Sequence, residues 1–326
     1  MFSNASLFSR IVGLAVFLAL IVIVLGAYTR LSDAGLGCPD WPGCYGQLSV
    51  PESVIGDEFR RPLEKSKAWK EMVHRYVAGT LGLLILAILF MVIKGLPSVK
   101  QSIGLPVVLL ITVIFQALLG MWTVTMLLSP VIVSAHLIGG LTTLSLLWWL
   151  FLNQRKVITL RTSPTSKLKF FTSLGLVLVI VQIFLGGWTS SNYAALACGI
   201  DFPTCASMWW PKMDFSSAFD IGHTSGVNYE FGVLDSPART AIQFVHRVGA
   251  LIVFVYLSSL AIKLIKQGEE LLHLGWLLLI VLFLQVSLGI MNVAMALPLS
   301  IAVSHNLVAA LLLLTIIRIN HSVFKA

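Results

Sequence analysis

Long apolar runs, each close to the length needed to cross a bilayer, recur along the chain. Eight of them lie near 10–29, 73–93, 104–127, 131–152, 168–190, 241–262, 272–295 and 299–318. A spanning helix needs about 20 apolar residues, because hydrocarbon offers no partner for a free backbone amide or carbonyl. The stretches 101–154 and 271–317 lack Asp, Glu, Lys and Arg and are too long for one span. Pro130 and Pro298 divide them where tight turns are expected. The pattern predicts an all-α polytopic membrane protein with eight transmembrane helices.

The composition agrees with this pattern. Hydrophobic residues make up 57% of the 326 residues and charged residues only 11%, too few to coat a soluble protein of this size. A net charge of +8 is also found in proteins that bind nucleic acid. However, no basic cluster is interleaved with aromatic residues as a nucleic-acid surface requires, so membrane lipid is expected as a partner and nucleic acid is not.

The distribution of basic residues predicts the orientation. With both termini cytoplasmic, twelve of the 22 Lys and Arg lie on the cytoplasmic side, against only Glu269 and Glu270. Basic residues in short loops resist translocation. Two long loops, about 31–72 and 191–240, then face outward and contain all four cysteines. Because no Arg-rich leader precedes the first span, we expect the inner membrane of a bacterium, with the cysteine loops in the periplasm.

The two halves of the sequence resemble each other. LGAYTRLSDAGLGCPDWPGC from Leu25 recurs as LGGWTSSNYAALACGIDFPTC from Leu185, and LLITVIFQALLGMWTV ending at Val124 recurs as LLIVLFLQVSLGIMNV ending at Val293. Each half has four spans, so the second half enters the membrane in the same sense as the first. We expect two parallel-repeat four-helix bundles, residues 1–155 and 156–326.

Four histidines occupy matching positions in the repeat: His74, His136, His246 and His305. All are expected in the first turn or two of spans that run inward, at one depth near the external face. Two imidazoles facing across a bundle are what an axially ligated haem iron requires. Zinc or copper is the alternative, disfavoured because no third ligand shares this depth.

Two kinds of polar residue accompany these histidines. Arg75 and Arg247 each follow a histidine at the outer membrane edge, where they either extend toward lipid headgroups or pair with haem propionates. Gln116 and Gln285 lie in the middle of their spans, where we expect them to form hydrogen bonds between helices.

One position separates the halves. Glu71 lies one helical turn before His74, whereas the matching residue before His246 is Gln243, which is isosteric but not ionisable. One interpretation is that Glu71 contributes only to the surface charge. The sharper hypothesis is that Glu71 transfers a proton or stabilises a cation beside the haem of the first half.

The cysteines fall into two close pairs, one in each long loop. Cys38 and Cys44 enclose PDWPG, and Cys198 and Cys205 enclose GIDFPT. Such short loops close easily, so two local disulfides are expected. They either staple the loops or exchange with the thiols of a partner, and the absence of C-x-x-C spacing disfavours exchange.

Together, GAYTRLSDAGLGCPDWPGC, EMVHR and the four membrane histidines resemble the haem A synthase family over nearly the whole chain. The resemblance implies an oxidoreductase that converts the methyl group of haem O to a formyl group through hydroxylation, giving haem A for cytochrome oxidase. It also implies that His74 and His136 hold haem O, that His246 and His305 hold a haem B cofactor, and that Glu71 is catalytic.

Other readings and partners follow from the same residues. A di-haem b-type cytochrome carrying electrons from quinol would need no Glu71, and a membrane thiol-disulfide oxidoreductase would use the cysteine loops as its active site. Haem O synthase is an expected partner, and the sequence names no electron acceptor. Gly139 and Gly140 would permit the close helix contacts of a homo-oligomer.

Overall fold

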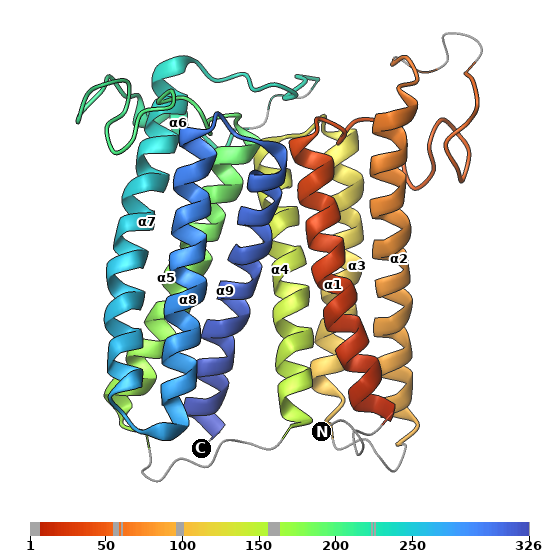
Figure 1. Ribbon diagram of the computed structural model, residues 1–326. Helices are drawn as coiled ribbons and strands as arrows, with labels where there is room; N and C mark the ends of the chain where they lie inside the picture. The colour runs from red at the N-terminus through yellow and green to blue at the C-terminus, as the bar shows by residue number, and fades with distance from the viewer. Residues whose placement is uncertain are drawn as a thin grey trace. The chain divides into compact units, whose positions relative to one another are not determined.

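A computed structural model describes residues 7–325 except 55–58, 60, 96–100, 156–163, 223 and 225. These residues form helices and no named strand (Figure 1). The helices are α1 Leu7–Leu31, α2 Lys65–Ile93, α3 Gly104–Thr125, α4 Pro130–Asn153, α5 Ser166–Ser191, α6 Phe215–Ala218, α7 Ser236–Ile265, α8 Glu269–Ala294 and α9 Leu299–Lys325. All but the four-residue α6 are long and apolar enough to cross a membrane, which confirms the predicted all-α membrane fold with eight candidate spans.

Two helices begin earlier than their apolar runs. Helix α2 begins at Lys65 instead of near 73, and α7 at Ser236 instead of near 241. Their added turns are polar, so hydropathy alone did not reveal them. The side chain of Asp235 caps α7 by accepting from the N–H of Ala238. The long loops are therefore 32–64 and 192–235, shorter than the predicted 31–72 and 191–240.

The two hairpins divided by proline turn in the same way. Leu127 and Leu128 have φ of 47° and 62°, and Ala296 and Leu297 have φ of 55° and 62°. After each pair of left-handed residues the next helix begins, at Pro130 in α4 and directly after Pro298 in α9. Proline suits a helix start because the first N–H groups of a helix have no partner within it. The tight turns expected at both prolines are confirmed.

The chain divides into two compact units, Met1–Gln154 with Gly222–Glu230 and Arg155–Ile221 with Phe231–Ala326. In the first unit, α1 and α3 each pack on α2 and α4, so α2 and α4 lie diagonally across a four-helix bundle. In the second unit, α5 and α8 each pack on α7 and α9 in the same order. Each unit therefore holds its second and fourth long helices on opposite sides of its centre.

One segment of the second long loop packs with the first unit. The N–H of Tyr229 donates to the carbonyl of Leu127 at 3.0 Å, and Glu230 forms an ion pair with Arg61 at 2.9 Å. The hydropathy pattern held no sign of this packing, because it rests on single backbone and charge contacts.

Candidate functional site

The structure brings the four predicted histidines together in two pairs. His74 on α2 and His136 on α4 face each other across the first unit, with ring centroids 6.5 Å apart and ring planes at 80°. His246 on α7 and His305 on α9 are close enough to interact electrostatically in the second unit. Because α2 and α7 begin early, His74 and His246 lie between two and three turns inside their helices rather than in the first turn or two.

The spacing of the first pair fits a shared iron. An imidazole nitrogen lies about 1 Å from its ring centroid and a metal–imidazole bond is about 2 Å long, so two imidazoles on one metal have centroids about 6 Å apart. The observed 6.5 Å agrees with this value. Among the described residues, no group of three or more His, Cys, Asp or Glu is arranged to hold a metal ion. A haem needs only two axial ligands from the protein, so the pair suits haem better than zinc.

A glycine on the neighbouring helix faces each histidine. Added Cβ atoms at these glycines would lie 3.0 Å from the ring of His74 and 3.1 to 3.3 Å from the other three rings. The four glycines are Gly26 on α1, Gly120 on α3, Gly186 on α5 and Gly289 on α8. Such contacts are tighter than most real Cβ contacts, so a side chain here would push the imidazole aside. Glycine therefore lets the imidazoles sit between closely packed helices.

Glutamines four residues before three of these glycines contact the histidines. The Nε2 of Gln116 lies 2.9 Å from Nδ1 of His136, and that of Gln182 lies 3.0 Å from Nδ1 of His246. Gln285 approaches Nε2 of His305 at 3.2 Å. The expected hydrogen bonds between helices are confirmed for Gln116 and Gln285, and both end on a histidine. Gln182 was missed, although the recurring pattern Q-x-x-L-G could have revealed it.

Two further glycines close around the first glutamine. A Cβ at Gly139 would collide with Oε1 of Gln116, and one at Gly140 would lie 3.4 Å from its Nε2. These glycines were expected to permit contacts with a second copy of the chain. Instead they face a side chain of their own unit, so they give no support to a homo-oligomer.

Glu71 and Gln243 make the same backbone contact in their own units. The N–H of Cys38 donates to Oε2 of Glu71 at 2.9 Å, and the N–H of Cys198 donates to Oε1 of Gln243 at 2.6 Å. Gln243 also donates to the carbonyl of Ala195 at 2.6 Å. Each side chain thus ties a helix to its disulfide loop, and the difference between the two is the negative charge of Glu71.

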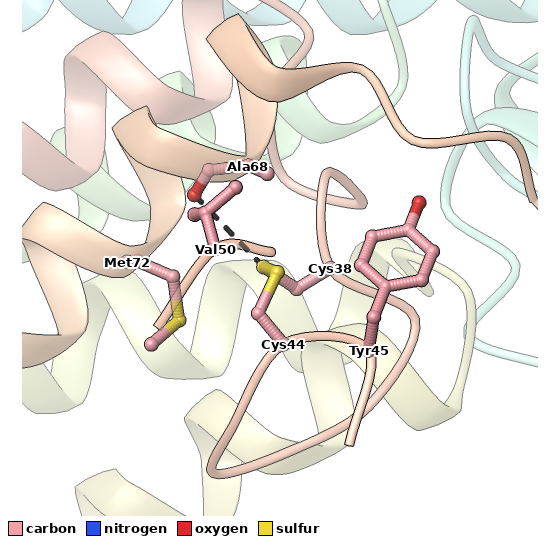
Figure 2. Close-up of a cluster of buried hydrophobic side chains, with 6 residues drawn as sticks. All are labelled: Cys38, Cys44, Tyr45, Val50, Ala68 and Met72. Atoms are coloured by element: carbon pink, nitrogen blue, oxygen red, sulfur yellow. Dashed lines mark hydrogen bonds between the residues drawn. A yellow bond between two sulfur atoms is a disulfide. The ribbon is translucent and has the colours of Figure 1, made fainter. Parts of the chain in front are cut away.

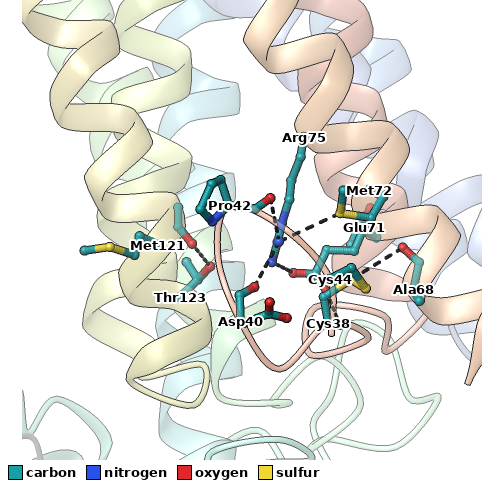
Figure 3. A network of polar contacts seen from close by, with 12 residues as sticks. Cys38, Asp40, Pro42, Cys44, Ala68, Glu71, Met72, Arg75, Met121 and Thr123 are labelled. Atoms are coloured by element: carbon teal, nitrogen blue, oxygen red, sulfur yellow. Dashed lines mark hydrogen bonds and ion pairs between the residues drawn. A yellow bond between two sulfur atoms is a disulfide. The ribbon is translucent and has the colours of Figure 1, made fainter. Parts of the chain in front are cut away.

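The charge of Glu71 is buried and paired. Its side chain is 6% exposed and forms an ion pair with Arg75 at 2.5 Å (Figure 3). The same guanidinium donates to the carbonyls of Asp40 at 3.0 Å, Pro42 at 3.3 Å and Gly43 at 2.5 Å. Removing one partner of a buried pair leaves the other without compensation, so Glu71 and Arg75 depend on each other for their place in the structure.

Arg247 has far fewer contacts than Arg75. One nitrogen donates to the carbonyl of Thr204 at 2.8 Å. Its other terminal nitrogen and its Nε are buried without hydrogen bonds among the described residues. A guanidinium with two buried nitrogens that donate to no partner is suited to a carboxylate. Of the two arginines proposed for haem propionates, Arg247 therefore has donors available, while both terminal nitrogens of Arg75 are engaged.

Both predicted disulfides are present and buried. The bonds are Cys38–Cys44 and Cys198–Cys205, with Cα atoms 4.8 and 4.4 Å apart. The first packs in a cluster with Tyr45, Val50, Ala68 and Met72 (Figure 2). The exposed fraction is 0% for three of the cysteines and 3% for Cys205. Thiol exchange needs access to a sulfur, so burial favours stapling of the loops.

Comparison with known proteins identifies the family. The model of the cytochrome oxidase assembly protein family matches residues 9–317. The chain belongs to this family. It is similar to a protein named Heme A synthase from Shewanella oneidensis, 48% identical over 93% of this chain and 92% of the relative. Proteins of the same name from Bacillus licheniformis and Rickettsia canadensis are each 26% identical, the first over 88% of this chain and 86% of the relative, the second over 96% of both. The resemblance seen in the sequence motifs is thus confirmed.

Proposed function

We propose that this membrane protein is a haem A synthase, an oxidoreductase that converts the methyl group of haem O to the formyl group of haem A. The observation that carries the proposal is a histidine pair in each unit, together with a buried carboxylate, Glu71, whose counterpart in the second unit is the uncharged Gln243. A protein that only carried electrons would need the two pairs and no such carboxylate. The relatives named Heme A synthase support the same conclusion.

The two pairs take different haems in this proposal. His74 and His136 hold the substrate haem O, and His246 and His305 hold a haem B cofactor. The unpartnered, buried Nδ1 atoms of His74 and His305 and the spacing of the first pair support these positions as ligand sites. When bound, haem B supplies reversible one-electron redox chemistry. The two unused nitrogens of Arg247 bind a propionate of this cofactor.

Glu71 is the catalytic residue of the proposal. Oxidation of the methyl carbon withdraws electrons from it and releases protons, so positive charge develops there. A carboxylate one helical turn from the ligand His74 stabilises that charge or accepts a proton. The ion pair with Arg75 and the N–H of Cys38 hold the carboxylate in place. Gln243 makes the matching loop contact with no charge, as befits a site that only transfers electrons.

The membrane location and orientation of the chain are part of the same proposal. The eight candidate spans lie in the inner membrane of a bacterium, with both termini in the cytoplasm and the disulfide loops in the periplasm. Oxidising conditions there preserve disulfides. Haem O synthase supplies the substrate, and cytochrome oxidase receives the product.

The test is an analysis of bound porphyrins. The chain is expressed with a source of haem O, purified, and extracted with acidic solvent, beside Glu71→Gln. We expect haem A and haem B from the wild type. The amide in the variant can accept from the N–H of Cys38 as Gln243 accepts from the N–H of Cys198, so the variant should fold. It should accumulate haem O or its hydroxylated form. Haem B alone in both samples would identify an electron-carrying cytochrome instead, and haem in neither would favour a thiol oxidoreductase.

A further inference from the structure

The two bundles differ in the seam between their second and third long helices. This seam joins α2 to α3 in the first unit and α7 to α8 in the second. Helix α8 packs closely on α7, whereas α3 packs much less closely on α2. The remaining pairs of neighbouring helices pack about alike in the two units. The first unit is therefore looser at this one seam.

An aromatic pair fills the seam of the second unit. Phe254 on α7 and Phe283 on α8 meet edge to face, with ring centroids 5.4 Å apart and ring planes at 88°. This arrangement is favourable for aromatic rings, so the pair holds the two helices together. Phe254 stands eight residues after the candidate ligand His246, which places it about 12 Å further along the helix.

Neither ring has an aromatic counterpart in the first unit. When the repeats are aligned on their histidines, Phe254 corresponds to Gly82 and Phe283 corresponds to Ile114. A Cβ added at Gly82 would meet nothing within 4 Å, so open space lies beside this glycine. The first unit thus has a gap at the position that Phe254 occupies in the second.

The burial of neighbouring residues supports this alignment. Leu81 and Ile85 of α2 are buried, and so are their counterparts Val253 and Leu257 of α7. Because the same positions face the bundle in both helices, Gly82 lies on the same helix face as its aromatic counterpart. The space beside Gly82 is therefore the unfilled part of the seam between α2 and α3.

The chemistry of the two haems gives this gap a use. Haem O carries a long, largely apolar isoprenoid chain, hydroxyethylfarnesyl, where haem B has a vinyl group. The chain is attached on the porphyrin edge away from the propionates. Charged propionates turn toward water at the end of the bundle near the disulfide loop, so the chain extends the other way, toward the depth of Gly82. A packed bundle interior has no spare volume for it, so it must leave between two helices.

We propose that the seam beside Gly82 takes the isoprenoid chain of haem O, and that Phe254 excludes this chain from the second unit. These two residues thereby decide which porphyrin each histidine pair accepts. Both determine specificity and neither touches the iron. The assignment of haem O to the first unit rests on the proposed haem A synthase function.

The experiment measures binding in one unit at a time. His305→Ala removes a ligand of the second unit, and this full-length variant, purified from haem-depleted cells, is titrated with haem O and separately with haem B. Adding Gly82→Phe should weaken the binding of haem O by about 10-fold or more, the scale of a steric clash in a packed site. The dissociation constant of haem B should not change, because haem B has no chain to displace.

The matched control adds bulk one turn away. Gly79→Leu introduces the residue found at this position in α7, on a face that is exposed in both helices. A Cβ there also meets nothing within 4 Å, so the variant should fold. It should leave the dissociation constants of both haems unchanged.

The reciprocal variant opens the second unit and does not depend on the folding of Gly82→Phe. In a chain with His136→Ala, which removes a ligand of the first unit, Phe254→Ala should strengthen the binding of haem O by a similar factor. The binding of haem B should not change. Leu251→Ala is the control, because its side chain is 62% exposed and lies outside the seam.

Two results would overturn the inference. Equal weakening of haem O and haem B by Gly82→Phe would show that the ring distorts the histidine site. Unchanged binding of haem O in both Gly82→Phe and Phe254→Ala would assign the seam to membrane lipid. Failure of the proposed function is distinct from both. If the wild type forms no haem A and the seams still control the binding of haem O, the specificity stands and the synthase function fails.

Discussion

In both units a side chain of the same length binds the backbone of a disulfide loop, yet only in the first unit is that side chain charged. Glu71 accepts from Cys38 and pairs with Arg75, while Gln243 accepts from Cys198 and leaves Arg247 with two unused nitrogens. The shared contact is structural, because it appears twice. The carboxylate of Glu71 and the two unused nitrogens of Arg247 each appear once, so they are the features to associate with the different tasks of the two units.

The largest effect should come from neutralising the two arginines in turn. Arg75→Gln leaves the carboxylate of Glu71 buried without its cation, which typically costs about 3–5 kcal/mol. Arg247→Gln removes one hydrogen bond to the carbonyl of Thr204, a loss of about 1 kcal/mol. Thermal unfolding in detergent measures both. Beyond this small loss of stability, Arg247→Gln should reduce the content of haem B. Equal destabilisation by the two variants would contradict the difference between the units.

Removal of the disulfides should have the next largest effect. Replacing both cysteines of a pair with serine should cost about 2–3 kcal/mol in either unit, because each bond closes a short loop. The Cys38 and Cys44 double variant should also lower haem A formation, since the N–H of Cys38 positions Glu71. The Cys198 and Cys205 variant should lower stability only. Loss of haem A formation in both, at matched folded fractions, would indicate a redox role for the bonds.

The glycines that face histidines provide a finer comparison. Gly26→Ala and Gly186→Ala should each displace an imidazole, at a cost of about 1–3 kcal/mol for overpacking. The first should lower the amount of bound haem O and the second that of haem B, as measured by porphyrin extraction. Gly79→Ala is the control, because nothing lies within 4 Å of the added Cβ. If all three variants behave alike, close packing against the histidines is not what these glycines provide.

The smallest effect is expected for Gln243→Glu. The new carboxylate would stand four residues before Arg247, the spacing at which Glu71 pairs with Arg75. The gain of an ion pair should offset the desolvation of the carboxylate to within about 1 kcal/mol. The haem B content should fall as in Arg247→Gln, because the new carboxylate competes with the propionate for Arg247. Haem A formation per bound haem B should stay near the wild-type rate, because the second unit is not the site of oxidation. A rate reduced as strongly as in Glu71→Gln would show that the two positions are equivalent.

Much of this architecture could be predicted from the sequence because hydrocarbon imposes strict rules. Uninterrupted apolar runs had to be helices, and the matched histidines and close cysteine pairs were visible as repeats. The early starts of α2 and α7 could not be seen in the same way, since their first turns are polar and are fixed by contacts such as the cap at Asp235. The packing of Tyr229 and Glu230 with the first unit also rests on tertiary contacts.

The partners of the side chains were harder to predict than their positions. Arg75 was expected to face either lipid headgroups or a propionate, and it binds Glu71 and three loop carbonyls instead. Glu71 is only four residues away, but the three carbonyls lie more than 30 residues away in the sequence, so the spacing of residues around Arg75 did not reveal them. The histidine partner of Gln182 was likewise hidden until the repeated Q-x-x-L-G pattern was aligned with the helices.

The central claim is that the first unit binds the substrate haem and the second the cofactor haem. The most direct test removes one ligand from each unit, His136→Ala and His305→Ala, in cells that supply haem O, and identifies the porphyrins retained. The account predicts that His136→Ala keeps haem B and loses haem O and haem A, while His305→Ala loses haem B. Loss of the same porphyrin from both variants would contradict the division of labour between the two units.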